Sequence, residues 1–153
     1  MNRHFQYAAL VLRLRALGGA GEMSHREGYF LTPREGVVRA AVYGGAKSKL
    51  RAYVSPFQSG TLYLYHNPAR DTRKVCDFDV SAWRPEIRER LERTLTASAV
   101  AEALLAGQGG GSESAAAFAL ANQTLDALAC AGEKLCEKVY VHFLWHWLDI
   151  LGL

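Results

Sequence analysis

Residues 1–80 contain several short stretches in which apolar and polar residues alternate. Leucine occupies every second position from Leu10 to Leu14, and the intervening positions become basic at Arg13 and Arg15. In residues 61–66, leucines and tyrosines alternate in the same way. Alternation with a period of two is typical of a strand that buries one face. The expected strands are residues 10–15, 28–32, 37–43, 61–66 and 75–80.

The connections between these strands carry turn residues and no long helical pattern. Residues 32–36 and 67–72 mark turns, and residues 17–25 form a glycine-rich loop. Residues 52–54 are expected to be extended before Pro56 interrupts the ladder. Five strands with short connections in about 75 residues predict a small closed or nearly closed β-barrel.

The last of these strands places cysteine on an apolar face. Cys76, Phe78 and Val80 fall on one side, and Asp77 and Asp79 fall on the other. A free cysteine behaves as a small apolar residue in a core. The pattern therefore predicts that Cys76 is buried in the barrel.

A helical pattern replaces the alternation after residue 81. Pro85 suits a first helical turn, and Ile87, Leu91 and Leu95 then recur at helical spacing, which predicts a helix to about Leu105. Oppositely charged residues four apart are expected to pair on its outer side. These pairs are Glu86 with Arg90 and Glu89 with Arg93.

Two further helices are expected after the glycine-rich break at residues 107–111. Ser112 can cap the second helix, and Gly132 follows its end. The third helix, residues 133–151, is apolar on nearly every side from Val139 onward, so it needs cover all round. The apolar face of the second helix consists of Phe118, Ala121, Leu125 and Leu128. The predicted fold is thus α+β, with a five-stranded barrel in residues 1–80 and about three helices in residues 81–153.

The charge is divided unevenly along the chain. Residues 1–75 hold twelve lysines and arginines against four acidic residues, a net charge of +8, so the remainder carries −5 of the total +3. A basic half favours a polyanionic partner, although a solvated basic surface has the same composition. The three cysteines show no CxxC spacing, which favours a reducing cytoplasm, and no membrane span or metal-binding cysteine motif is expected.

The strongest candidate for phosphate contact follows the third expected strand. Gly44 and Gly45 free the backbone to bend, and Lys47, Lys49 and Arg51 then place three cations within five residues. This stretch also contains the LysSer pair of a P-loop. Ala41 and Ala46 occupy the positions where a P-loop requires glycine, and no helix is expected to follow. Nucleotide hydrolysis is therefore not expected, and neither is a cofactor.

A second candidate site lies on the last expected helix. His142, His146 and Asp149 recur on one face at a spacing that can hold a metal ion, which leaves a metal-dependent hydrolase as an alternative. Histidines on an apolar helix are also found hydrogen-bonded within interfaces, and the HExxH motif is absent. No catalytic triad or pair of carboxylates stands out, so we expect a protein that is not an enzyme.

The order of these motifs resembles the RecO family of bacterial recombination mediators. The similar stretches are residues 9–13, 30–36, 44–48, 56–57 and 149–153. The resemblance implies an OB-fold that binds single- and double-stranded DNA, followed by a helical domain that contacts proteins. It further implies annealing of complementary strands, help in loading RecA during DNA repair in the RecF pathway, and location at the nucleoid in the cytoplasm. The implied partners are RecR, the tail of single-stranded-DNA-binding protein and, indirectly, RecA.

Two departures from the family pattern accompany this resemblance. Residues 18–25 replace the usual pattern after the first strand, and the family continues into further helices, often with a cysteine zinc motif. We therefore expect a fragment or a short variant. A second hypothesis is an OB-fold protein-interaction module without DNA binding.

The residues expected to contact DNA combine cations with an aromatic side chain. Cations neutralise phosphates with little sequence preference, and aromatic rings can stack on bases. Tyr43, Tyr63 and Tyr65 are expected on the same side as Arg39, although outward tyrosines also serve ordinary cross-strand packing. The expected DNA-binding set is Arg34, Arg39, Lys47, Ser48, Lys49, Arg51 and Tyr63.

Overall fold

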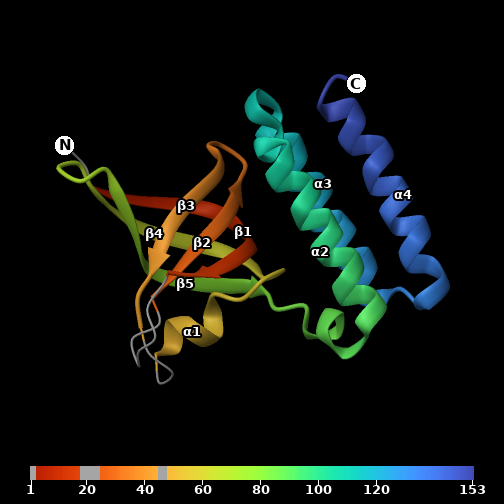
Figure 1. The fold of residues 1–153 in the computed structure, drawn as a ribbon, viewed down its shortest axis with the longest axis horizontal. Helices are drawn as coiled ribbons and strands as arrows, with labels where there is room; N and C mark the ends of the chain where they lie inside the picture. The colour runs from red at the N-terminus through yellow and green to blue at the C-terminus, as the bar shows by residue number, and fades with distance from the viewer. Residues whose placement is uncertain (1–2, 18–24, 45–47) are drawn as a thin grey trace.

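The protein folds into a closed five-stranded β-barrel followed by a group of helices, which confirms the predicted α+β class. The computed structural model describes residues 3–17, 25–44 and 48–153 (Figure 1). The barrel occupies one end of the molecule and the long helices the other, with α4 outermost. Lys47, one of the residues predicted to contact DNA, lies outside the described residues.

The barrel has the strand order of an OB-fold. Its strands follow each other around the barrel as β1-β2-β3-β5-β4, and β4 closes the barrel by pairing with β1. β3 and β5 run parallel where Ala41 meets Lys74, and the other neighbouring strands run antiparallel. We therefore describe the barrel as OB-fold-like. The strands are β1 (His4–Ala16), β2 (Arg26–Thr32), β3 (Gly36–Val42), β4 (Ser59–Asn67) and β5 (Thr72–Ala82).

The predicted alternation holds in β3 and β4. Val38, Ala40 and Val42 of β3 are buried in the barrel interior, together with Leu62 and Leu64 of β4. The residues between them face outward, because successive side chains of a strand point to opposite faces. On the outward face of β3, Val37 packs against the helical part, and Arg39 is exposed.

β1 buries both of its faces along residues 9–12, where one apolar face was predicted. Ala9 and Val11 belong to the barrel interior, whereas Leu10 and Leu12 pack with the helices. The prediction was wrong here because the helical part covers the outside of β1. A strand that is buried on both sides carries a continuous apolar run.

Cys76 is exposed, contrary to the prediction that it lies in the barrel core. Tyr63 pairs with Asp77, and the next residue of β4, Leu64, pairs with Val75. Cys76 is thus the extra residue of a β-bulge, and a bulge reverses the alternation along the bulged strand. Val75 takes the inward position instead.

A short helix, α1 (Lys49–Tyr53), follows Ser48. This finding corrects the extended conformation predicted for residues 52 and 53, whereas Val54 is extended as predicted, and it corrects the expectation that no helix follows the LysSer pair. Leu50 and Tyr53 pack against the barrel core, and Val54 is buried within it. Because these apolar residues recur at helical spacing, a helical turn brings them to the same end of the barrel.

The first predicted helix is broken in two at Arg90. A 3-10 turn, η1 (Pro85–Glu89), precedes α2 (Leu91–Ala106), and Arg90 between them is extended at φ −131° and ψ 132°. The break turns the predicted apolar face outward, so Leu91 and Leu95 are 71% and 59% exposed. The predicted i,i+4 pairing across the break is replaced by other contacts, in which Arg93 donates to the backbone oxygens of Ala131 and Glu86 at 2.8 and 3.1 Å. The buried face of α2 consists instead of Ala97, Val100, Ala101 and Leu104.

The predicted glycine break and the next helix are present, with a different start. Gly109, Gly110 and Gly111 have positive φ values of 67°, 83° and 57° within η2 (Gln108–Glu113). α3 (Ser114–Cys130) begins two residues after the predicted cap Ser112. Its predicted apolar face is confirmed, since Ala121, Leu125 and Leu128 are buried and Phe118 packs against the same core.

α4 (Glu133–Ile150) is covered on one side only. Cys136, Phe143 and Trp147 are buried against the rest of the helical core. The described residues do not supply the all-round cover that the sequence predicted, and Val141 and Trp145 are 64% and 75% exposed. Within the described ranges, no helix has the length and apolar character needed to cross a membrane.

A buried arginine joins the barrel to the helices. Arg84 has a left-handed backbone, and its guanidinium donates to Asp126 Oδ1 at 2.8 Å and to Asn122 Oδ1 at 2.9 Å, both on α3. The same guanidinium donates to the Phe57 carbonyl at 2.9 Å and to Ser59 Oγ at 2.8 Å, both in the barrel part. These bonds fix the end of β5 against α3.

Candidate nucleic-acid interface

Two arginines and a tyrosine form a row across the outward faces of three adjacent strands. The strand register places Arg13 of β1 beside Tyr29 of β2, and Tyr29 beside Arg39 of β3. Both arginines are exposed, and Tyr29 is half-buried. The Tyr29 hydroxyl donates to Glu27 Oε1 at 2.9 Å, which helps to hold the ring in place. We call these three residues the Arg13–Tyr29–Arg39 row.

Arg39 borders two hollows on the barrel surface. One, of about 480 Å³, is lined by Tyr43 and by Arg73 at the start of β5. The other, of about 720 Å³, is lined by Arg13, Tyr29 and the glycine-rich segment between α2 and α3. An extended ligand that occupies both hollows would pass Arg39, so this residue has a central position on the surface.

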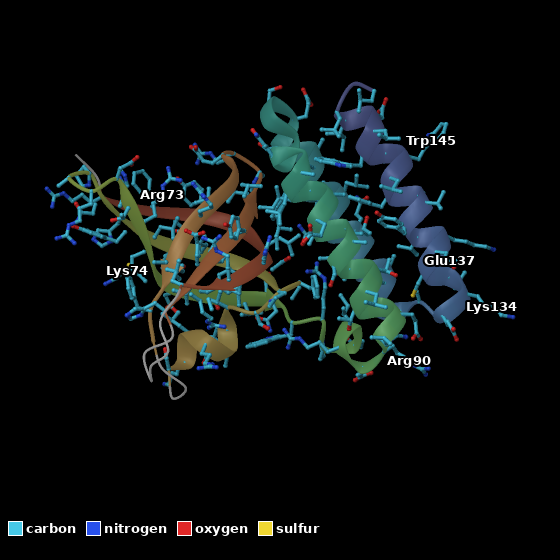
Figure 2. The ribbon with its side chains drawn as sticks, in the orientation of Figure 1. Arg73, Lys74, Arg90, Lys134, Glu137 and Trp145 are labelled. Carbon is cyan, nitrogen blue, oxygen red and sulfur yellow. The ribbon has the colours of Figure 1, made fainter. Side chains whose placement is uncertain are left out.

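The turn between β4 and β5 adds cations that the sequence interpretation missed. Arg70 is exposed in this turn, Arg73 and Lys74 are exposed at the start of β5, and Figure 2 shows Arg73 and Lys74 at the barrel end of the molecule. Tyr65 pairs with Lys74 across the strands. In OB-folds this loop and the face of strands 2 and 3 bind oligonucleotides. The cluster of cations in residues 70–74 of the sequence is the signal from which this loop could have been predicted.

The structure does not bring Tyr63 together with Arg39. Tyr63 pairs with Asp77 and lines a separate hollow of about 530 Å³ together with Asp79 and Trp83. Its outward face differs from that of Arg39 because β5 lies between β3 and β4 in the closed barrel. The described residues lining this hollow include two carboxylates and no cation, whereas Glu27 and Asp71 in the hollow of Arg39 are accompanied by Arg39 and Arg73. Carboxylates without a neighbouring cation disfavour the approach of phosphate, so the hollow of Tyr63 is a poor site for a nucleic-acid backbone.

The remaining predicted cations occupy two places on the barrel. Arg34 is exposed in the turn between β2 and β3, next to Pro33, whose carbonyl accepts a 2.9 Å hydrogen bond from Ser114 Oγ on α3. Lys49 and Arg51 are exposed on α1, and Ser48 precedes that helix. The predicted set is therefore spread over more than one surface.

Arg51 lies close enough to Arg26 of β2 to lower the pKa of its guanidinium. Burial lowers the pKa of the Arg26 guanidinium, and the nearby Arg51 lowers it further. Two neighbouring cations repel each other, and an anion between them relieves that repulsion. This pair extends the candidate surface to the end of the barrel that carries α1.

The two histidines of the alternative metal site lie next to each other on the outside of α4. His142 Nε2 and His146 Nε2 are 3.1 Å apart, and both side chains are exposed. Asp149 does not complete a site with them, since no group of three or more potential metal ligands occurs among the described residues. The pair therefore gives little support to a metal-dependent hydrolase.

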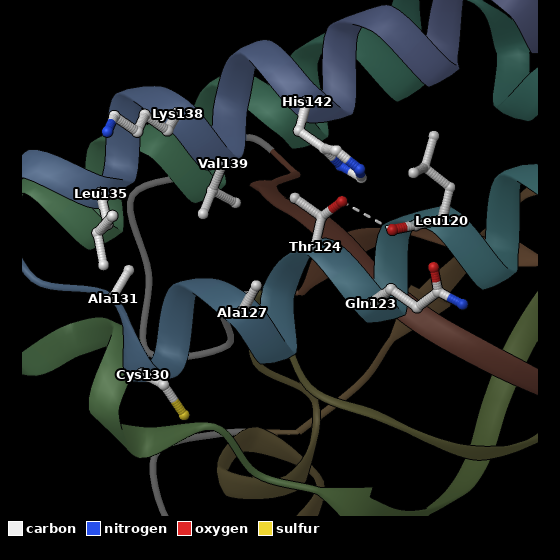
Figure 3. A pocket seen from close by; sticks show the side chains of 10 residues that line it. All are labelled: Leu120, Gln123, Thr124, Ala127, Cys130, Ala131, Leu135, Lys138, Val139 and His142. Atoms are coloured by element: carbon white, nitrogen blue, oxygen red, sulfur yellow. Dashed lines mark hydrogen bonds between the residues drawn. The ribbon is translucent and has the colours of Figure 1, made fainter.

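An apolar hollow of about 450 Å³ separates parts of α3 and α4 (Figure 3). Leu120, Leu135 and Val139 line it, and the Thr124 hydroxyl turns away to donate to the Leu120 carbonyl at 2.8 Å. Such a surface suits apolar side chains of a protein partner better than phosphate.

Comparison of the sequence with models of known protein families and with curated proteins gave no match. The resemblance to the RecO family therefore stays an expectation drawn from the sequence motifs. What the chain binds has to be argued from its own surface.

Proposed function

We propose that the protein binds single-stranded nucleic acid along the outward face of β1, β2 and β3. The observation that carries this proposal is the Arg13–Tyr29–Arg39 row, in which an aromatic ring lies between two exposed cations. Single-strand binding combines cations that follow the backbone with aromatic rings on which bases stack. Arg73, which lines the same hollow as Arg39, extends this surface toward the β4–β5 turn.

The RecO resemblance extends the proposal to DNA and to strand annealing. Complementary strands repel each other through their phosphates, and cations on the barrel reduce that repulsion. Base pairing then supplies the free energy, so annealing needs no nucleotide. Assistance in RecA loading, with RecR and single-stranded-DNA-binding protein as partners, is the corresponding proposal for the helical part.

Salt-dependent binding of a fluorescent oligonucleotide tests the proposal. Arg39→Glu is expected to weaken binding, and the slope of log affinity against log salt concentration should become shallower by about 0.7 for the lost phosphate contact. Arg90→Glu is the matched control, because it makes the same charge change at an exposed position before α2, on the helical part. If both variants change the affinity and the slope equally, the barrel face is not the binding site.

A protein-interaction module without nucleic-acid binding is the second candidate. The apolar hollow between α3 and α4 favours it, because a protein side chain fits there. Absence of oligonucleotide binding at low salt, together with retained binding of a partner protein, supports this alternative.

A further inference from the structure

The outer side of α4 carries a regular stripe of exposed residues. They recur alternately four and three residues apart, the spacing that forms the seam between two packed helices. Val141, Trp145 and Leu148 of the stripe are large apolar residues that remain exposed. We call this set the α4 stripe, and it consists of Lys134, Lys138, Val141, Trp145 and Leu148.

The α4 stripe points away from the rest of the chain. The opposite side of α4 is buried against the other helices through Cys136, Phe143 and Trp147. Figure 2 shows Lys134 and Trp145 projecting outward from α4, away from α2 and α3. A contiguous exposed apolar surface of this kind marks an interaction site more often than an ordinary surface does.

The charges along the stripe differ between its two ends. Lys134 and Lys138 of the stripe lie near its start, beside Glu133 and Glu137, whereas Asp149 follows Leu148 near its end, and the last turn of α4 carries no basic residue. The end of a helix also carries a partial negative charge from its free carbonyl groups. A second α4 in the same direction would place lysines beside lysines. In the opposite direction, Lys138 of each copy comes close to Asp149 of the other.

We propose that α4 packs antiparallel against α4 of a second copy of this chain and forms a twofold symmetric dimer. If the twofold axis crosses the two helices at the level of Phe143, Val141 of one copy lies opposite Trp145 of the other. Lys138 of one copy then lies opposite Leu148 of the other. The Lys138 ammonium then lies near Asp149 and the Trp145 ring of the other copy, which provide a carboxylate and an aromatic face for a cation. Each contact occurs twice, because a twofold interface uses the same surface on both copies.

This dimer leaves the barrel surfaces free. α4 is the outermost helix, and the barrel lies at the opposite end of the chain (Figure 1). The two barrels therefore face away from the interface. The inference does not depend on the proposed nucleic-acid function, because it is tested by the mass of the protein alone.

Sedimentation of the full chain over a range of concentrations tests this inference. The unaltered protein is expected to shift from monomer to dimer with rising concentration, and Trp145→Glu is expected to remain monomeric. Leu91→Glu is the matched control, since it introduces the same charge at another exposed apolar residue, on α2. It should dimerise as the unaltered protein does. A monomer at all concentrations, or equal loss of the dimer in both variants, overturns the inference.

Charge reversal tests the antiparallel direction. Lys138→Glu should weaken dimerisation by about tenfold, because it places two acidic residues together at both ends of the symmetric interface. Asp149→Lys should weaken dimerisation by a similar factor. The variant that carries both Lys138→Glu and Asp149→Lys should recover most of the lost dimer affinity. If the double variant is weaker than either single variant, the two residues do not meet and the antiparallel arrangement is wrong.

Discussion

At the scale of single residues, the position of a side chain on the barrel determines which charged groups surround it. Arg39 and Tyr63 both lie on strands with clear alternation, and both were predicted to contact DNA. The hollow of Arg39 has a second cation, Arg73, to offset its two carboxylates, whereas the described residues lining the hollow of Tyr63 include Asp77 and Asp79 and no cation. The sequence predicted that both face outward, but the direction of each face depends on the strand order around the barrel.

The cysteines provide a residue-scale prediction. Cys76 and Cys130 are exposed and Cys136 is buried, and burial, with a smaller effect of Glu92, raises the pKa of the Cys136 thiol. A raised pKa means less of the reactive thiolate. A thiol reagent should therefore react quickly with two groups in the native protein and with the third only after denaturation.

Cys76→Ser is the variant that checks the β-bulge. It should reduce the fast-reacting thiols from two to one, because Cys76 is one of the two exposed cysteines. If the number of fast-reacting thiols stays at two, Cys76 lies inside the barrel and the bulge is absent.

At the scale of elements, local patterns predicted the strands and the later helices well. The apolar face of α3 follows directly from the spacing of Ala121, Leu125 and Leu128. The break at Arg90 and the short helix α1 were missed, because both depend on how a segment packs against distant residues. Arg84 shows this dependence, since its partners Phe57, Asn122 and Asp126 are far from it in the sequence.

Replacement of this arginine should weaken the attachment of the helices to the barrel. Arg84→Ala removes four hydrogen bonds of a buried guanidinium and leaves the Phe57 carbonyl without this donor, so we expect it to lower the free energy of unfolding by about 2–4 kcal/mol. Arg90→Ala is the control, because it removes the same type of side chain at an exposed position of the same segment, and it should cost less than about 1 kcal/mol. Urea unfolding measures both effects. Equal losses in the two variants would show that the contacts of Arg84 contribute no special stability.

At the scale of the whole molecule, the two proposed interaction surfaces lie at opposite ends. The basic row and the β4–β5 turn lie on the barrel, and the α4 stripe lies on the outermost helix. The uneven charge of the sequence predicted a basic barrel, but only the closed strand order shows which cations are neighbours. The uncovered side of α4 was unexpected, because the apolar sequence alone predicted cover all round.

Photocrosslinking tests the proposed nucleic-acid face most directly. The full chain is irradiated with a bromouracil-containing single strand, and the crosslinked peptides are mapped by mass spectrometry. The Arg13–Tyr29–Arg39 row predicts crosslinks at Tyr29 or Tyr43, since these residues line the two hollows that Arg39 borders. Crosslinks at Tyr63 or Trp145, with none at Tyr29 or Tyr43, would contradict the proposal that nucleic acid follows the face of β1, β2 and β3.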